Sequence, residues 1–224
     1  MRTLVDYYVH PLSEEAIEAQ AGEWRTRAVR ALGYEYFNVV DFIRQVLRKS
    51  LKKGEQLRIK FMPVDSPGPP AKVSFRPSLT LWVRADVWTA AEKGDPLARY
   101  ILAHECGHLI LHSNEAKGFS DESGRRIPDS ARERSAEWQA DEFANDFLAP
   151  IHIVERLRDV HQVVIRCGVP NEIASQRLAD VVAYWESKSR PYGMDCDACF
   201  GCDTHHIASR VRCRTCGRVS AAFL

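Results

Sequence analysis

Two histidines and a glutamate are spaced so that they could bind a metal ion and use it. The segment His104-Glu105-Cys106-Gly107-His108 is an HExxH motif inside a strongly apolar run. Residues four apart lie on one face of a helix, so His104 and His108 can direct two imidazoles at one ion while Glu105 stands beside them as a base. The motif therefore predicts a zinc hydrolase, with Glu105 as the catalytic residue and the two histidines as ligands of a catalytic zinc ion.

The helix that should carry this motif has a well-marked start. Asp95 is suited to the N-cap, and Pro96 follows it at the first helical position. His112 extends the histidine row, but one ion is not easily shared by three residues spread over two turns, so we expect it to support a ligand or pack in the core. Cys106 points away from the ligands and is expected to be a buried, inert thiol. The expected buried positions of the helix are Leu97, Ile101, Leu102, Leu109, Ile110 and Leu111.

A catalytic zinc site needs a third protein ligand, with one position left for water. The metzincin continuation of HExxH would require Gly at position 111 and His at position 114. The chain has Leu111 and Asn114 there, which excludes this solution. The gluzincin solution instead takes a glutamate from a second helix, so such a helix is expected downstream.

Residues 130–148 are the candidate for this second helix. Ser130 and Glu133 have the spacing of a capping box, and small and apolar residues recur at helical spacing after them. Glu137 and Asp141 then lie one turn apart on one face. We predict Glu137 as the third zinc ligand and Asp141 as the acceptor for the distal N–H of a ligating histidine, His104 being preferred. The alternative for both acids is a solvated helix face.

These two segments carry a resemblance to a known family. AHECGHLILH (residues 103–112) and EWQADEFANDFLAP (residues 137–150) resemble the ImmA/IrrE metallopeptidases, whose pattern is AHExGHxxLH followed by ExxADxFAxxLLxP. The resemblance implies a gluzincin-like zinc protease whose substrates are DNA-binding repressors. In that family, the two motif histidines and the first glutamate of the second segment bind zinc, and the motif glutamate is the catalytic base. In this chain those residues are His104, His108, Glu137 and Glu105.

The expected fold is α+β: a zincin-like catalytic domain with a small mixed sheet packed on the HExxH helix and the second ligand helix, then C-terminal helices and a zinc-ribbon-like tail. Residues 1–149 are assigned to the catalytic core, 150–190 to a helical recognition or packing segment, and 191–224 to the tail. Within the core, Ser13 and Asn38 can begin helices that run to Gly33 and Gly54. Strands are expected at residues 57–61, 73–75 and 79–83.

Residues 167–178 (CGVPNEIASQRL) resemble an element that follows the catalytic core in ImmA/IrrE proteins. It could dock a repressor or DNA in the manner of half a helix-turn-helix, or simply pack against the core. In gluzincin-like folds, as the resemblance implies, an edge strand holds extended substrate by backbone pairing.

The tail concentrates five of the seven cysteines between residues 196 and 216. Paired CxxC turns suit a closed tetrahedral zinc site, and we predict Cys199, Cys202, Cys213 and Cys216 as its ligands, with Cys196 as an alternative. Its expected role is to staple a tail too short to form a core. Contact with nucleic acid is the other possibility, since the last acidic residue is Asp203. The arginines that could make such contact are Arg210, Arg212, Arg214 and Arg218.

Composition gives weaker guidance. The chain has 224 residues and a formal net charge of +1, which favours no class of partner. Its first residues contain no apolar run of signal-peptide length, and no stretch approaches the roughly 18 apolar residues of a membrane span, so a cytoplasmic protein is expected. The predicted function is a zinc endopeptidase acting on a repressor-like protein. The alternative is a non-catalytic zinc-containing regulator that binds a repressor, a toxin partner or DNA; the intact Glu105 argues against it.

Overall fold

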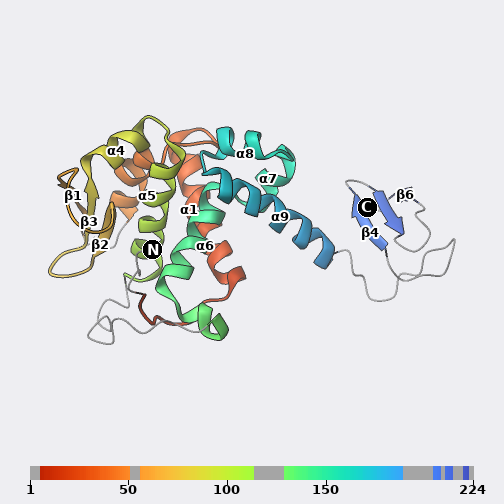
Figure 1. Ribbon diagram of the computed structural model, residues 1–224, viewed down its shortest axis with the longest axis horizontal. Coiled ribbons are helices and arrows are strands. Elements are labelled where there is room, and N and C mark those ends of the chain that lie inside the picture. Colours follow the sequence, from red (N-terminus) through yellow and green to blue (C-terminus); the bar gives the residue numbers. More distant parts are fainter. Residues whose placement is uncertain are drawn as a thin grey trace.

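Helices form most of the part of the chain that the structure, a computed structural model, describes, with one three-stranded sheet at their side and a second one near the C-terminus (Figure 1). The described residues are 6–50, 56–113, 129–188, 204–207, 210–213 and 219–221. Its helices are α1 (Glu14–Leu32), α2 (Val39–Asp41), a π-helix (Phe42–Leu47), α3 (Arg48–Ser50), α4 (Ala85–Glu92), α5 (Pro96–Leu111), a 3₁₀-helix (Asp129–Arg134), α6 (Ala136–Leu148), α7 (Ile151–Leu157), α8 (Val160–Cys167) and α9 (Asn171–Lys188). The strands are β1 (Arg58–Met62), β2 (Ala71–Ser74), β3 (Thr80–Arg84), β4 (Thr204–Ile207), β5 (Arg210–Cys213) and β6 (Val219–Ala221). The α+β class predicted from the sequence is confirmed.

The first two helices begin where the sequence predicts. The Ser13 hydroxyl accepts a hydrogen bond from the Ala16 N–H at 3.3 Å, and α1 ends at Gly33, whose φ of 86° is the left-handed conformation that glycine adopts readily. Asn38 caps α2 by accepting from the Val40 N–H at 2.8 Å. The expected second helix is not uniform, because a π-helix follows α2 before α3 ends at Ser50. Residues 51–55, including Gly54, lie outside the described part.

The first sheet is mixed and has the order β1-β3-β2. The central strand β3 pairs in parallel with β1, with Arg58 opposite Thr80, and antiparallel with β2, with Ala71 opposite Val83. All three strands lie within about one residue at each end, or two at the start of β2, of the predicted segments. Leu81 is fully buried, because its side chain faces the helices, and α4 follows β3 directly. The sheet stands beside α5 on one side of the molecule (Figure 1).

Helix α5 begins as predicted, with Asp95 accepting from the Ala98 N–H at 2.8 Å and Pro96 at its first position. Leu102 and Leu109 are fully buried, but the expectation that Leu97 is buried is wrong. Leu97 is 60% exposed, because it lies in the first turn, before the helix enters the core.

The predicted start of the second ligand helix is also wrong. Residues 129–134 form a 3₁₀-helix, and α6 begins only at Ala136, where Ser135 accepts from the Trp138 N–H at 2.9 Å. The N-terminal segment causes this break: Val9 N–H donates to the Arg134 carbonyl at 2.9 Å, and Ala136 N–H donates to the Tyr7 carbonyl at 3.0 Å. This antiparallel pairing needs an extended backbone at Ser135, which a helix starting at residue 130 could not supply.

The C-terminal helices share one hydrophobic core with the rest. Ile153 of α7, Val163 of α8 and Ala174 of α9 are fully buried in the same cluster as Leu102 and Phe147. Arg177 of α9 donates to the Ala149 carbonyl at 2.9 Å and pairs with Asp146 of α6. Residues 167–178 thus pack against the core, which is the second of the two roles considered for them.

The three C-terminal strands form an antiparallel sheet of order β4-β5-β6, in which Thr204 pairs with Cys213. Of the predicted tail ligands, only Cys213 belongs to a described strand, and its side chain is not described. The others, Cys199, Cys202, Cys216 and the alternative Cys196, lie outside the described residues. Among the helices that the structure describes, none combines the length and apolar character needed to cross a membrane.

Candidate metal centre

The side chains of the HExxH motif meet those of α6 because two helices approach unusually closely. Gly107 is the point of contact: a Cβ added there would lie 3.0 Å from the Cα of Ala140 and 3.1 Å from its carbonyl oxygen. Any larger residue would hold the helices apart. Glycine at this position of the motif therefore allows α6 to bring its first turn, which carries Glu137, over the histidines.

Three predicted ligands converge at this contact. The imidazole Nε2 atoms of His104 and His108 lie 3.0 Å apart. The Glu137 carboxylate faces both, with Oε2 at 3.3 Å from His104 Nε2 and Oε1 at 3.5 Å from His108 Nε2. One donor atom from each residue falls within 4.8 Å of the others, so the three together could hold one metal ion. Their side chains are only 13–22% exposed, which places this cluster at the edge of the core.

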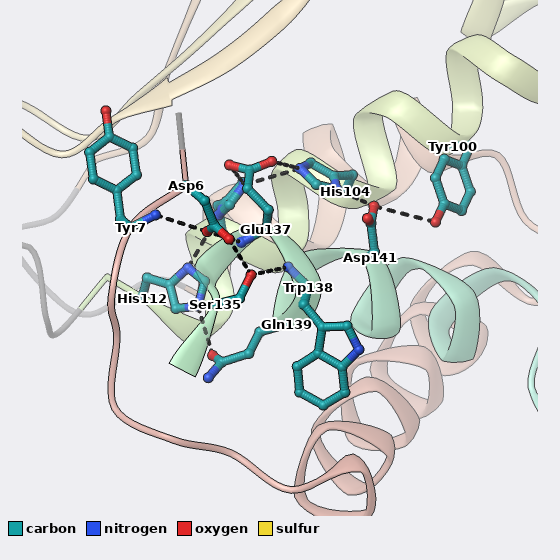
Figure 2. Close-up of polar contacts among 11 residues, drawn as sticks. Asp6, Tyr7, Tyr100, His104, His112, Ser135, Glu137, Trp138, Gln139 and Asp141 are labelled. Atoms are coloured by element: carbon teal, nitrogen blue, oxygen red, sulfur yellow. Dashed lines mark hydrogen bonds and ion pairs between the residues drawn. The ribbon is translucent and has the colours of Figure 1, made fainter. Parts of the chain in front are cut away.

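Asp141 lies behind the first histidine, where the sequence places it. Its Oδ1 accepts from His104 Nδ1 at 2.7 Å, one helical turn beyond Glu137 (Figure 2). Burial alone would lower the pKa of His104, but the hydrogen bonds to Asp141 and Glu137 outweigh it and raise that pKa to about 10. Burial likewise would raise the pKa of Glu137, yet the two histidines lower it to about 2. Without a metal ion, a proton on His104 therefore balances the two carboxylates.

The backbone of Glu137 is held in place by a residue that lies outside both motifs. Asp6, in the segment that precedes α1, accepts the Glu137 N–H at 3.2 Å and the Ser135 hydroxyl at 2.6 Å (Figure 2). A carboxylate at this position also interacts favourably with the positive end of the α6 dipole. Asp6 thus fixes the first turn of α6, and with it the backbone of the third ligand.

The second histidine is supported by a chain of neutral groups. His108 Nδ1 lies 3.2 Å from His112 Nδ1, and His112 Nε2 lies 2.9 Å from Gln139 Oε1. Figure 2 shows His112 and Gln139 beneath the ligands. His112 is fully buried, and this burial lowers its pKa to about 4. His112 thus touches a predicted ligand without joining the cluster.

Glu105 lies among these groups but is not one of the clustered ligand atoms. Its residue is only 7% exposed. Burial raises the pKa of the Glu105 carboxyl, and the nearby His108 and His104 oppose that rise. A carboxylate in this setting holds a proton more readily than one in water, which suits a base that must accept and later release a proton.

Two other residues of α5, Cys106 and Tyr100, lie outside the cluster, and the buried thiol predicted for Cys106 is confirmed. Cys106 is fully buried and free, and burial raises the pKa of its thiol, which leaves it unreactive at neutral pH. Tyr100 is partly buried, and its hydroxyl donates to Asn145 Oδ1 at 3.1 Å. Neither contributes an atom to the cluster.

Three contributors were missed by sequence reasoning: Asp6, Gly107 and Gln139. Asp6 and Gln139 act over long sequence separations, so no local pattern could have revealed them. Gly107 did carry a signal, since a glycine in the middle of an apolar helix costs stability and usually has a packing reason.

No protein-family model matches this chain, and no curated protein matches it either.

Proposed function

We propose that this protein is a zinc-dependent endopeptidase. The observation that carries the proposal is the convergence of two imidazoles and one carboxylate, from two helices packed at Gly107, beside a buried glutamate. An exposed acidic cluster without such partners would be ordinary. Here each ligand has its own supporting hydrogen bond, which is typical of metal sites.

The donor set fits zinc. Histidine nitrogen and carboxylate oxygen bind Zn²⁺ at about 2.0–2.2 Å, and a tetrahedral arrangement then places ligand atoms roughly 3.3 Å apart. The two Nε2 atoms lie 3.0 Å apart, and each has a Glu137 oxygen close to that spacing: Oε2 at 3.3 Å from His104 and Oε1 at 3.5 Å from His108. Two histidines and one glutamate also leave a fourth position for water, as in catalytic sites.

The chain's own groups supply the remaining chemistry. A bound zinc ion would polarise the substrate carbonyl and lower the pKa of the attacking water. The Glu105 carboxylate takes one proton from that water as the water oxygen adds to the carbonyl carbon. It then returns this proton to the amide nitrogen as the C–N bond breaks, which leaves a free amine and a carboxylic acid that keeps the second proton of the water.

The substrate class follows from the motif resemblance alone. ImmA/IrrE-like motifs imply a DNA-binding repressor as substrate, and a cytoplasmic location goes with that target. A second zinc ion in the tail is also part of this proposal. The sequence supports it, because Cys199 with Cys202 and Cys213 with Cys216 form two CxxC pairs.

The test compares the wild type with Glu105→Gln and with Glu133→Gln, which makes the same change at an exposed glutamate and serves as the control. Each zinc-loaded protein is incubated with a proteome-derived peptide library and with the repressors encoded beside its gene, and new termini are identified by mass spectrometry. Glu105→Gln should keep its zinc and lose cleavage by at least about 100-fold. The control should cleave at the wild-type rate.

Two results would count against the proposal. Cleavage at the wild-type rate by zinc-loaded Glu105→Gln would remove Glu105 from the mechanism. A wild-type protein that binds zinc but cleaves neither the library nor any repressor would favour the non-catalytic regulator instead, and repressor binding without cleavage would establish that alternative.

A further inference from the structure

A directional chain of hydrogen bonds runs from the backbone to the second predicted ligand. Its members are Gln139, His112 and His108, joined at 2.9 Å and 3.2 Å. Gln139 and His112 are both fully buried, so water does not compete for these bonds. The direction of each bond therefore depends on the protein groups at the end of the chain.

That end is fixed by two backbone carbonyls. Gln139 Nε2 donates to the Glu133 carbonyl at 2.6 Å and to the His10 carbonyl at 2.8 Å. Carbonyl oxygens only accept, so rotating the amide would bring Gln139 Oε1 against two other oxygens. The orientation of this amide is thus unambiguous, and its Oε1 must face His112.

The protons on both imidazoles follow from this orientation. Because Gln139 Oε1 only accepts, His112 Nε2 must carry the proton. The neutral ring then has a lone pair on Nδ1, which faces His108 Nδ1. Since one of these two nitrogens must donate, His108 carries its proton on Nδ1 and keeps a lone pair on Nε2, the atom nearest Glu137 and His104.

We propose that Gln139 and His112 are positioning residues that hold His108 in the one neutral tautomer able to bind the metal through Nε2. This inference rests on the proposed zinc site. It also separates the two histidine ligands: His104 is oriented by a charged carboxylate on α6, whereas His108 is oriented by a neutral relay that ends on the N-terminal segment and on the turn before α6.

The first experiment reads the tautomers directly in the metal-free full-length protein. Long-range ¹H–¹⁵N correlation spectra of histidine side chains at pH 7.5 distinguish a protonated Nδ1 from a protonated Nε2. We expect His108 as the Nδ1–H form and His112 as the Nε2–H form. An Nε2–H form of His108 would overturn the proposal, whether or not the protein binds zinc.

The second experiment measures zinc affinity by competition with a chromophoric chelator. His112→Leu leaves His108 Nδ1 without its acceptor and should weaken zinc binding by roughly 10- to 100-fold. His112→Asn can place an amide oxygen near the position of Nδ1 and should recover most of that loss. Leu102→Ala, on the far side of α5 and also fully buried, is the control for a general loss of stability and should leave zinc affinity unchanged.

Substitution of Gln139 tests whether its amide sets the direction of these hydrogen bonds. Gln139→Met offers His112 no comparable acceptor and the two carbonyls no donor, so it should yield a mixture of His108 tautomers.

The outcomes separate this inference from the proposed function. If wild-type protein binds no zinc, the proposed function fails, while the spectra of the metal-free protein still decide the relay. If zinc binds normally to His112→Leu, or if His112→Asn is as weak as His112→Leu, the relay has no positioning role and the inference fails while the zinc site stands.

Discussion

Gly107→Ala is expected to weaken zinc binding much more than it destabilises the fold. The added Cβ would lie 3.0 Å from Ala140 Cα. Ordinary contacts between carbon atoms are about 3.5–4.0 Å, so α6 must retreat from α5 by a few tenths of an ångström. Metal sites tolerate displacements of about 0.2 Å. Because Glu137 lies one turn before Ala140, the retreat carries the third ligand out of range, and zinc affinity should fall at least ~10-fold.

The free energy of unfolding should change much less. Alanine is favoured over glycine in a helix interior by ~0.8–1 kcal/mol, which offsets part of the ~1–3 kcal/mol that overpacking costs. The metal-free variant should therefore lose at most about 2 kcal/mol, measured by urea unfolding in the presence of chelator.

The matched control is Gly22→Ala on α1, where a Cβ would have no atom within 4 Å. It should gain up to ~1 kcal/mol of stability without any change in zinc affinity. Wild-type zinc affinity in Gly107→Ala would refute the argument that close helix packing positions Glu137.

Further predictions concern the ligands and the tail. Glu137→Ala should abolish tight zinc binding in a competition titration. Glu133→Ala should change zinc binding little, because Glu133 contacts Gln139 through its backbone carbonyl, which the substitution keeps. In the metal-free protein, the lowered pKa of Glu137 stabilises the fold at pH values above 4.5, the ordinary pKa of a glutamate, and this stability is lost as the pH falls towards about 2. The raised pKa of His104 stabilises the fold at pH values below 6.5, the ordinary pKa of a histidine, and this stability is lost as the pH rises through about 10. Unfolding measured at different pH values should therefore show the largest stabilisation by this pair between about pH 4.5 and 6.5. Zinc must displace the proton on His104, so zinc should stabilise the protein more as the pH rises from 6 to 8. Cys213→Ser with Cys216→Ser should lower the zinc content from two ions to one by metal analysis; an unchanged count would exclude the tail site.

The parts of the fold that the sequence predicts well depend on local spacing. The caps at Ser13, Asn38 and Asp95 were identified because a side chain needs only to reach the N–H two or three residues ahead. The convergence of the histidines with Glu137 was predicted because both motifs have helical periodicity, which places their polar residues on one face.

The start of α6 shows where local reasoning stops. Ser130 and Ser135 are both acceptable caps in sequence, and the Ser130–Glu133 spacing favours the former. The choice is made instead by Asp6, which accepts from Ser135 across 129 positions of sequence, and by the pairing of residues 7–12 with residues 133–136. No propensity encodes such a contact. The same holds for Gln139, whose amide bonds to His10.

Each proposed ligand is held by a different part of the chain. His104 is oriented by α6, His108 by the relay through Gln139, and the backbone of Glu137 by Asp6. All of these supports are hydrogen bonds within the protein, made by helices and segments that pack on one hydrophobic core. We therefore expect folding to order the ligands, so that little of the zinc-binding free energy is needed to assemble the site. This distinguishes the centre from small zinc modules, whose fold depends on the metal.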